Sequence, residues 1–320
     1  MKVFTWEDIA NKKVPKKESF GIFLQSLQNK LRATEGVLAA SHFGSTQRGD
    51  YSITSDVDIY VVYDEEYGFE LKNILEELYL EAKGYFIPLK VITVPKDEIL
   101  FSEHSPISPR LQQVLAYTAH KDDGCFVGDM KEYLFHYKTM SPECFMSAVR
   151  IDIERYIGYK LRKFYEGKLT NHIFSDRKRA EWVESVSNGF VHITRGVLAS
   201  YGGFEFIDGS VKEVWQALHQ NKKDTQAPDF FSQYLGARVG YLNCINNSLF
   251  DPPKGICLKE VLSEMGSEGW VKKYKGRDDL FQTPSEEINA EANYRQGFDL
   301  FAHHVGAFPE YVKILQKFLK

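Results

Sequence analysis

The sequence predicts an α+β protein, with a small mixed β-sheet in its N-terminal part and an all-α helical C-terminal part. Helix-like and strand-like segments alternate up to about residue 138, an order typical of a small sheet backed by helices. After that point nearly all apolar residues follow the three- or four-residue spacing of helices. The chain has 320 residues, 43% of them hydrophobic, so either part can bury its own core. We therefore predict two domains, residues 1–138 and residues 139–320.

Local periodicity predicts the elements of the N-terminal part in order. Apolar residues at helical spacing predict a helix over 19–34, and a short apolar run predicts a buried strand over 37–43. A polar loop, GSTQRGDYSITS, follows this strand. The next predicted elements are a strand over 56–63, a helix over 69–83, a strand over 85–94 and a helix that begins at Ser108-Pro109.

The C-terminal part has several helix-start signals. Ser141-Pro142 starts one helix, and a second is predicted over 177–199. Ser210 and Glu213 have the spacing of a capping box, a signature that Thr283-Pro284-Ser285-Glu286 repeats. We expect three large aromatic residues at helical spacing to lie in the core: Trp182, Phe190 and Trp215.

Composition and charge exclude several classes of protein. With 40 basic and 44 acidic residues, the net charge of −4 gives no global field that attracts nucleic acid, so DNA is not an expected partner. The four cysteines are scattered, without a CxxC pair, which favours free thiols in a reducing compartment. There is no signal-peptide pattern and no uncharged apolar run of ~20 residues. We expect a soluble, cytoplasmic protein with no membrane partner.

Two aspartates on a predicted strand are the first candidate for chemistry. Asp56 and Asp58 are two positions apart, so their side chains point to the same face of the strand. Two carboxylates so placed repel each other unless a cation lies between them. Oxygen ligands of this kind suit Mg²⁺, which is bound in proteins by one or two carboxylates together with substrate phosphates.

A second candidate lies at the end of the preceding strand. Gly44 allows the backbone to approach a ligand closely, and N–H groups at a helix start bind phosphate. Ser45 adds a hydroxyl donor, and Arg48 adds a planar cation suited to phosphate. A phosphate-binding bend and a metal-binding pair on neighbouring strands are the parts needed to move a nucleotidyl group.

The combined stretch, FGSTQRGDYSITSDVDIYVV, resembles the signature of the DNA polymerase beta-like nucleotidyltransferase superfamily: Gly-Ser, roughly ten residues, then Asp-x-Asp. The helical C-terminal part is similar in architecture to antibiotic nucleotidyltransferases. The resemblance implies that an NTP, most simply ATP, binds with one or two Mg²⁺ ions. Asp56 and Asp58 would hold the metal, and Gly44, Ser45 and Arg48 would hold the phosphates. An acceptor hydroxyl on a small molecule, a protein or an RNA would receive NMP, with release of pyrophosphate.

The sequence departs from the family pattern at one position. The family usually has a third carboxylate on a later strand, but the matching segment, LKVITV, has Lys90 and Ile92 there instead. Asp97 and Glu98 follow it, and neither fits the pattern. Some antibiotic nucleotidyltransferases use a glutamate from the second domain, and Glu154 is the candidate for that catalytic role here. The alternatives are a different strand alignment, or a weak or inactive enzyme.

Two other functions stay open on the sequence. A chain without the third carboxylate fits a nucleotide-binding regulator or antitoxin that does no chemistry. A tRNA-modifying toxin is the other possibility, supported only by a basic cluster that a solvated helix face also explains. The cluster consists of Lys160, Arg162, Lys163, Lys168, Arg177, Lys178 and Arg179.

Overall fold

The computed structural model describes residues 2–49, 51–97, 124–133, 142–170, 175–202, 210–220, 226–249 and 290–319. The chain falls into two compact units. The first contains Met1–Lys2, Val14–Tyr156 and Arg195–Ser210, and the second contains Val3–Lys13, Ile157–Thr194 and Val211–Lys320. The predicted boundary after residue 138 lies outside the described residues, so that boundary stays a prediction.

The first unit contains a mixed four-stranded sheet in the order β3-β2-β1-β4. Strand β1 (Val37–Phe43) runs antiparallel to β2 (Val57–Tyr63) and to β4 (Cys125–Val127), whereas β3 (Leu89–Pro95) runs parallel to β2. The short elements around these strands are α3 (Ser45–Arg48), the 3₁₀ helix η1 (Glu65–Tyr67) and α7 (Met130–Tyr133). A small mixed sheet followed by a mostly helical region confirms the predicted fold class.

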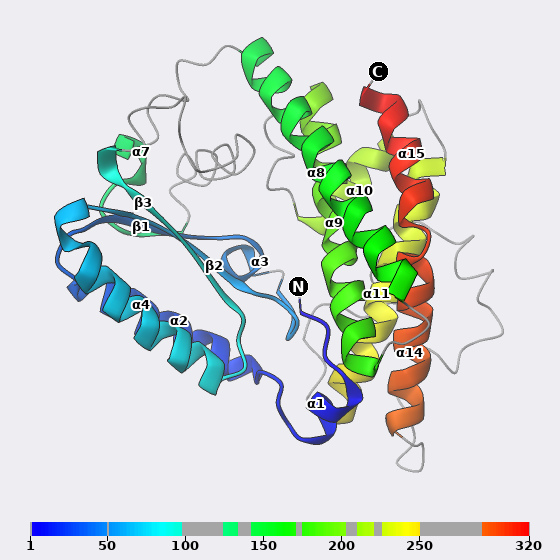
Figure 1. Ribbon diagram of the computed structural model, residues 1–320, viewed down its shortest axis with the longest axis horizontal. Helices are drawn as coiled ribbons and strands as arrows, with labels where there is room; N and C mark the ends of the chain where they lie inside the picture. The colour runs from blue at the N-terminus through cyan, green and yellow to red at the C-terminus, as the bar shows by residue number, and fades with distance from the viewer. Residues whose placement is uncertain are drawn as a thin grey trace. The chain divides into compact units, whose positions relative to one another are not determined.

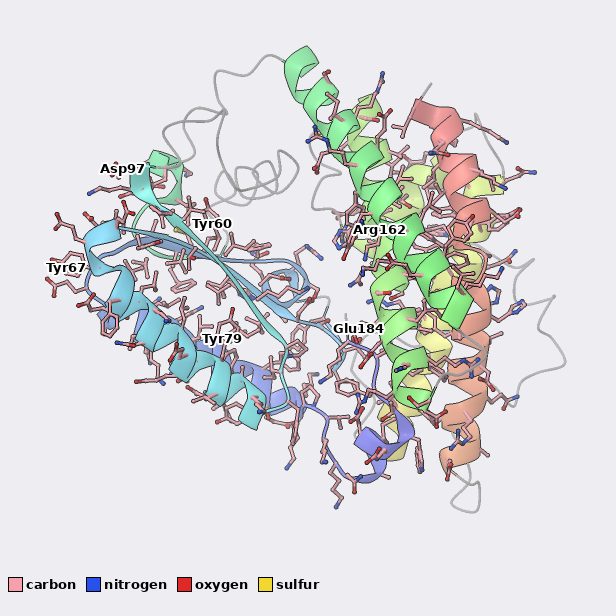
Figure 2. The ribbon with its side chains drawn as sticks, in the orientation of Figure 1. Tyr60, Tyr67, Tyr79, Asp97, Arg162 and Glu184 are labelled. Carbon is pink, nitrogen blue, oxygen red and sulfur yellow. The ribbon has the colours of Figure 1, made fainter. Side chains whose placement is uncertain are left out.

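Helices α2 (Lys17–Ala33) and α4 (Gly68–Gly84) lie side by side across one face of this sheet (Figure 1). Val57, Ile59 and Val61 of β2 are fully buried in the same apolar cluster as both helices. Because side chains alternate along a strand, Asp58 and Tyr60 point to the opposite face. Tyr60 is labelled on β2 in Figure 2. The sheet therefore presents the carboxylate of Asp58 on the face that the two helices do not cover.

The structure differs from the sequence prediction in one strand boundary and in several short elements. The strand predicted over 85–94 begins only at Leu89, because the backbone after α4 turns back on the helix: Ile87 N donates to Ala82 O (2.9 Å). Four short elements were not predicted: α1 (Trp6–Ala10), η1, β4 and α7. The helix predicted after Ser108-Pro109 and the capping box at 283–286 lie outside the described residues.

Helices make up most of the rest of the described chain. They are α8 (Pro142–Thr170), α9 (Asp176–Gly202), α10 (Val211–Gln220), α11 (Gln226–Leu249), α14 (Ala290–Val305) and α15 (Phe308–Leu319). Trp182, Phe190 and Trp215 are buried, as predicted. Phe190 stacks on Tyr234 with ring centroids 4.2 Å apart, and on Tyr311 at 5.2 Å. Among the described helices, none has both the length and the apolar content that spanning a bilayer requires.

The N-terminal segment Val3–Lys13 packs within the second unit. Tyr241 accepts a hydrogen bond from Phe4 N (2.9 Å), and Tyr294 donates one to Phe4 O (2.6 Å). Glu184 of α9, labelled in Figure 2, accepts a hydrogen bond from Val3 N (3.1 Å). These contacts join the start of the chain to helices that follow far later in the sequence.

Candidate active site

The bend predicted after β1 is present and is built on glycine. Gly44 precedes α3 with φ 82° and ψ −161°, a backbone conformation that residues other than glycine rarely adopt. The four-residue helix α3 follows, and Gly49 ends it in the left-handed conformation. Ser45 and Arg48, at the two ends of α3, are both half-buried. The structure therefore brings the three predicted phosphate-binding residues into one short turn.

The segment that leads into β2 is a buried turn rather than an open polar loop. Ser52, Thr54 and Ser55 are all buried. Ser55 Oγ accepts from Ser52 N (3.0 Å), and Ser52 Oγ lies 2.8 Å from Thr54 Oγ1. The hydroxyl groups satisfy one another and nearby backbone groups, so burying them carries little cost. This turn fixes the backbone that carries Asp56 into the strand.

Asp56 and Asp58 converge on one positive charge. Asp56 Oδ2 accepts a hydrogen bond from Lys90 Nζ, and Asp58 Oδ1 lies 4.0 Å from the same ammonium. The contact follows from sheet register, because Lys90 of β3 is paired with Asp58 of β2 in the parallel ladder. The two carboxylates thus lie on one face of the sheet, as their spacing predicts.

Charge around Asp56 keeps its carboxylate ionised. Burial by itself would raise the pKa of Asp56, but nearby positive charges, Lys90 among them, outweigh burial and lower this pKa to about 2. The Asp56 side chain is only 13% exposed, whereas that of Lys90 is 59% exposed. The carboxylate is therefore held in place while the ammonium sits on a solvent-facing, flexible stem.

A buried histidine connects β1, α3 and the start of β2. His42 Nε2 lies 2.7 Å from Thr46 Oγ1, and Thr46 Oγ1 donates to the backbone O of Asp56 (3.4 Å). Burial lowers the pKa of His42 to about 4, so this ring is neutral at physiological pH. His42 therefore acts as a structural link between the bend and the aspartates, a role that its sequence position alone did not reveal.

Comparison with known protein families agrees with this geometry. Residues 24–114 match the family model of the nucleotidyltransferase domain. This stretch of the chain is therefore similar to nucleotidyltransferase domains. This confirms the resemblance inferred from the Gly-Ser and Asp-x-Asp spacing. A search of curated proteins finds no match to the chain.

The matched region, residues 24–114, has donors that suit one magnesium ion bound together with a nucleotide. Asp56 and Asp58 supply two hard carboxylate ligands that already share a cation, and phosphate oxygens commonly complete the shell of Mg²⁺. In the described part of the chain, no group of three or more His, Cys, Asp or Glu side chains is arranged to hold a metal. Two carboxylates leave positions in the shell of Mg²⁺ that substrate phosphates can fill, so this pair suits a metal that binds together with a nucleotide.

The third carboxylate of the family is not found on β3. Lys90 stands beside Asp58 in the register, which supports the strand alignment made from the sequence. Asp97 follows the far end of β3 (Figure 2). Lys90 and Pro95, the last residue of β3, are five positions apart, roughly 16 Å along an extended strand, and Asp97 follows Pro95. Asp97 is thus too distant to act with Asp56 and Asp58, and Glu98 lies outside the described residues.

Glu154, the candidate base, is exposed on α8. Among the described residues, no hydrogen bond or ion pair given by the structure joins its side chain to Asp56 or Asp58. Its catalytic role stays a prediction.

Much of the basic cluster is already used in contacts within the chain. Lys160 is buried and donates to the backbone O of Ser185. Arg177 pairs with Asp8 (2.5 Å), and Arg179 pairs with Asp299 (2.6 Å). Arg162, labelled in Figure 2, and Lys163 both contact Glu166. These pairs favour a solvated, structural helix face over a surface for RNA phosphates.

Proposed function

We propose that the protein is a cytoplasmic, magnesium-dependent nucleotidyltransferase that moves NMP from an NTP, most simply ATP, to an acceptor hydroxyl and releases pyrophosphate. One observation carries the proposal: the carboxylates of Asp56 and Asp58 both face the ammonium group of Lys90, in a region similar to nucleotidyltransferase domains. The Gly44 bend directly beside Asp58 adds a place for phosphate. We keep residues 1–138 and 139–320 as the proposed catalytic and acceptor-binding domains.

Each residue has a distinct task in the proposed reaction. Backbone N–H groups at Gly44 and Ser45, with the guanidinium of Arg48, bind and orient the β- and γ-phosphates. Asp56 and Asp58 hold magnesium, which when bound neutralises charge on the triphosphate as pyrophosphate leaves. The acceptor oxygen forms a bond to the α-phosphorus while the bond from that phosphorus to pyrophosphate breaks. Glu154 is the candidate to take the hydroxyl proton.

Substitution of the two aspartates tests the proposal. The full-length protein is incubated with radiolabelled NTPs, Mg²⁺ and pools of small-molecule, tRNA and protein acceptors, and both labelled product and pyrophosphate are measured. Asp56→Asn and Asp58→Asn should each abolish transfer. Asp64→Asn is the matched control. Asp64 also adjoins β2 and pairs with a lysine, Lys96, but it lies at the other end of that strand. Transfer that persists in the double variant would overturn the metal assignment.

One observation favours a second function, nucleotide binding without chemistry. Lys90 pairs with Asp58 in the register of β3, the strand on which the family usually has its third carboxylate. A regulator of this kind would be stabilised against heat by an NTP with Mg²⁺, but would release no pyrophosphate with any acceptor pool. Measuring thermal stabilisation and pyrophosphate release on the same samples separates the two functions.

A further inference from the structure

A lysine occupies the place between the two aspartates where a metal ion is expected. Lys90 Nζ is hydrogen-bonded to Asp56 and lies 4.0 Å from Asp58 Oδ1. Both carboxylates are largely buried, whereas most of the lysine side chain is exposed to solvent. The protein thus supplies its own cation to a pair of like charges that would otherwise repel each other.

We propose that Lys90 is a resident cation that keeps divalent metal out of the site until an NTP arrives, and that limits the site to a single divalent ion. This inference rests on the proposed function, because it concerns the metal used for nucleotide transfer. It makes Lys90 a positioning residue whose ammonium moves from the aspartates to the nucleotide phosphates during binding.

The first part of the argument is charge balance. The group formed by Asp56, Asp58 and Lys90 carries a net charge of about −1, whereas the two carboxylates alone carry about −2. The lysine therefore weakens the attraction of the site for a free divalent ion. A metal that entered alone would have to displace the ammonium and would leave it facing the metal at close range. Coulomb repulsion between a divalent ion and an ammonium a few ångströms away is large even where solvent screens it.

The second part of the argument is that a bound NTP changes both the metal ligands and the negative charge available at the site. The triphosphate brings oxygen ligands that complete the metal shell, and it also brings negative charge for the displaced ammonium. Lysine is a compact charge on a flexible four-carbon stem, and the Lys90 side chain is 59% exposed. Because its ammonium end faces solvent, Lys90 can leave Asp56 once the triphosphate offers another negative partner. Nucleotide and metal are therefore expected to enter together.

The chain offers a matched control for this lysine. Lys96, directly after β3, pairs with Asp64, directly after β2. This second Lys–Asp pair joins the same two strands at their opposite ends. Substitution of Lys96 removes the same charge from the same sheet without touching Asp56 or Asp58.

Binding of Mn²⁺, measured by electron paramagnetic resonance and calorimetry on the full-length protein, tests the proposal. Without nucleotide, Lys90→Met should tighten Mn²⁺ binding about tenfold or more relative to the unsubstituted protein, and Lys96→Met should leave it unchanged. Lys90→Asp, which adds a carboxylate, should bind an additional Mn²⁺ ion when a non-hydrolysable ATP analogue is present. Thermal melting of each variant confirms that it is folded.

Two results would overturn the proposal: equal Mn²⁺ affinity for the unsubstituted protein and Lys90→Met, or two Mn²⁺ ions per bound ATP analogue in the unsubstituted protein. Failure of the proposed function is distinguishable from these. If Asp56→Asn abolishes transfer while Lys90→Met leaves Mn²⁺ affinity unchanged, the enzyme stands and the role of Lys90 falls. If no acceptor is ever modified but Lys90→Met gains Mn²⁺ affinity, Lys90 still controls the metal site of a nucleotide-binding protein.

Discussion

The backbone of Gly44 lies directly against the carboxylate of Asp58. A Cβ atom at Gly44 would be 2.8 Å from Asp58 Oδ2, closer than Cβ atoms in proteins come to other heavy atoms. The contact follows from strand pairing, because Phe43, the last residue of β1, is in register with Asp58 of β2. The bend and the carboxylate are therefore one structural unit, joined across two neighbouring strands.

Gly44→Ala should damage both stability and nucleotide binding. The new methyl group would push Asp58 aside, and alanine at φ 82° is strained, at a cost of about 1–3 kcal/mol in the free energy of unfolding. Gly21→Ala is the control, since nothing lies within 4 Å of a Cβ at that position in helix α2. Gly21→Ala should stabilise the protein by roughly 0.5–1 kcal/mol. Urea unfolding and titration with an ATP analogue measure both effects, and equal behaviour of the two variants would contradict the prediction.

The repulsion between Asp56 and Asp58 should lower the stability of the folded protein when no metal is bound. Without metal, Asp58→Asn removes one of two negative charges on the same face and leaves the Asp56–Lys90 pair intact. We expect this variant to be as stable as the unsubstituted protein, or more stable by up to ~1 kcal/mol, while losing function. Thermal unfolding in the presence of a chelator measures the change. A clear loss of stability would show that Asp58 has a structural role that the contacts described above do not explain.

Local sequence signals were sufficient for the parts of the site that depend on neighbouring residues. The bend at Gly44 and the shared face of Asp56 and Asp58 follow from residue type and from the two-residue period of a strand. The contact of Lys90 with Asp56 and Asp58 could not be predicted in this way, because it depends on the register of β3 against β2. In the sequence these two strands are separated by the helix α4. The sequence showed only that a lysine stands where an acid was expected.

Other features escaped prediction for related physical reasons. The segment around Ser52 and Thr54 is polar and therefore suggested an open loop, but its hydroxyl groups pair with each other and are buried. Strand β4 has only three residues, too few to show a period. The packing of Phe4 against Tyr241 joins residues 237 positions apart, and no local pattern encodes a contact of that length.

The buried ring of His42 should make stability fall as the pH decreases. The pKa of His42 is about 4 in the folded protein, because burial disfavours the charged form, and roughly 6.5 in an unfolded chain. Between these values only the unfolded state binds the proton, so stability is lost as pH falls from about 6.5 to 4, by at most ~3 kcal/mol. Denaturant unfolding at several pH values measures this loss.

His42→Gln isolates the contribution of that ring. Glutamine can still hydrogen-bond Thr46 but does not titrate, so the variant should lose less stability than the unsubstituted protein between pH 6.5 and 4, whatever its stability at pH 7. His303 is exposed on α14, and His303→Gln should retain the original pH dependence. Parallel pH profiles for the unsubstituted protein and His42→Gln would show that another group is responsible.

The hydroxyl group of Tyr241 should hold the start of the chain within the helical unit. This buried hydroxyl accepts from Phe4 N (2.9 Å) and donates to Phe4 O (3.2 Å). Burial raises the pKa of Tyr241 well above its ordinary value, so the donor stays protonated. Tyr241→Phe removes both hydrogen bonds at a buried site, which should cost about 1–3 kcal/mol in the free energy of unfolding. Tyr79→Phe, at a position 44% exposed on α4, should cost almost nothing.

Hydrogen exchange at the Phe4 amide distinguishes a local effect from a global one. Tyr241→Phe should accelerate exchange at this amide by a larger factor than the decrease in the free energy of unfolding alone would produce. An unchanged exchange rate would show that Tyr241 does not hold this segment.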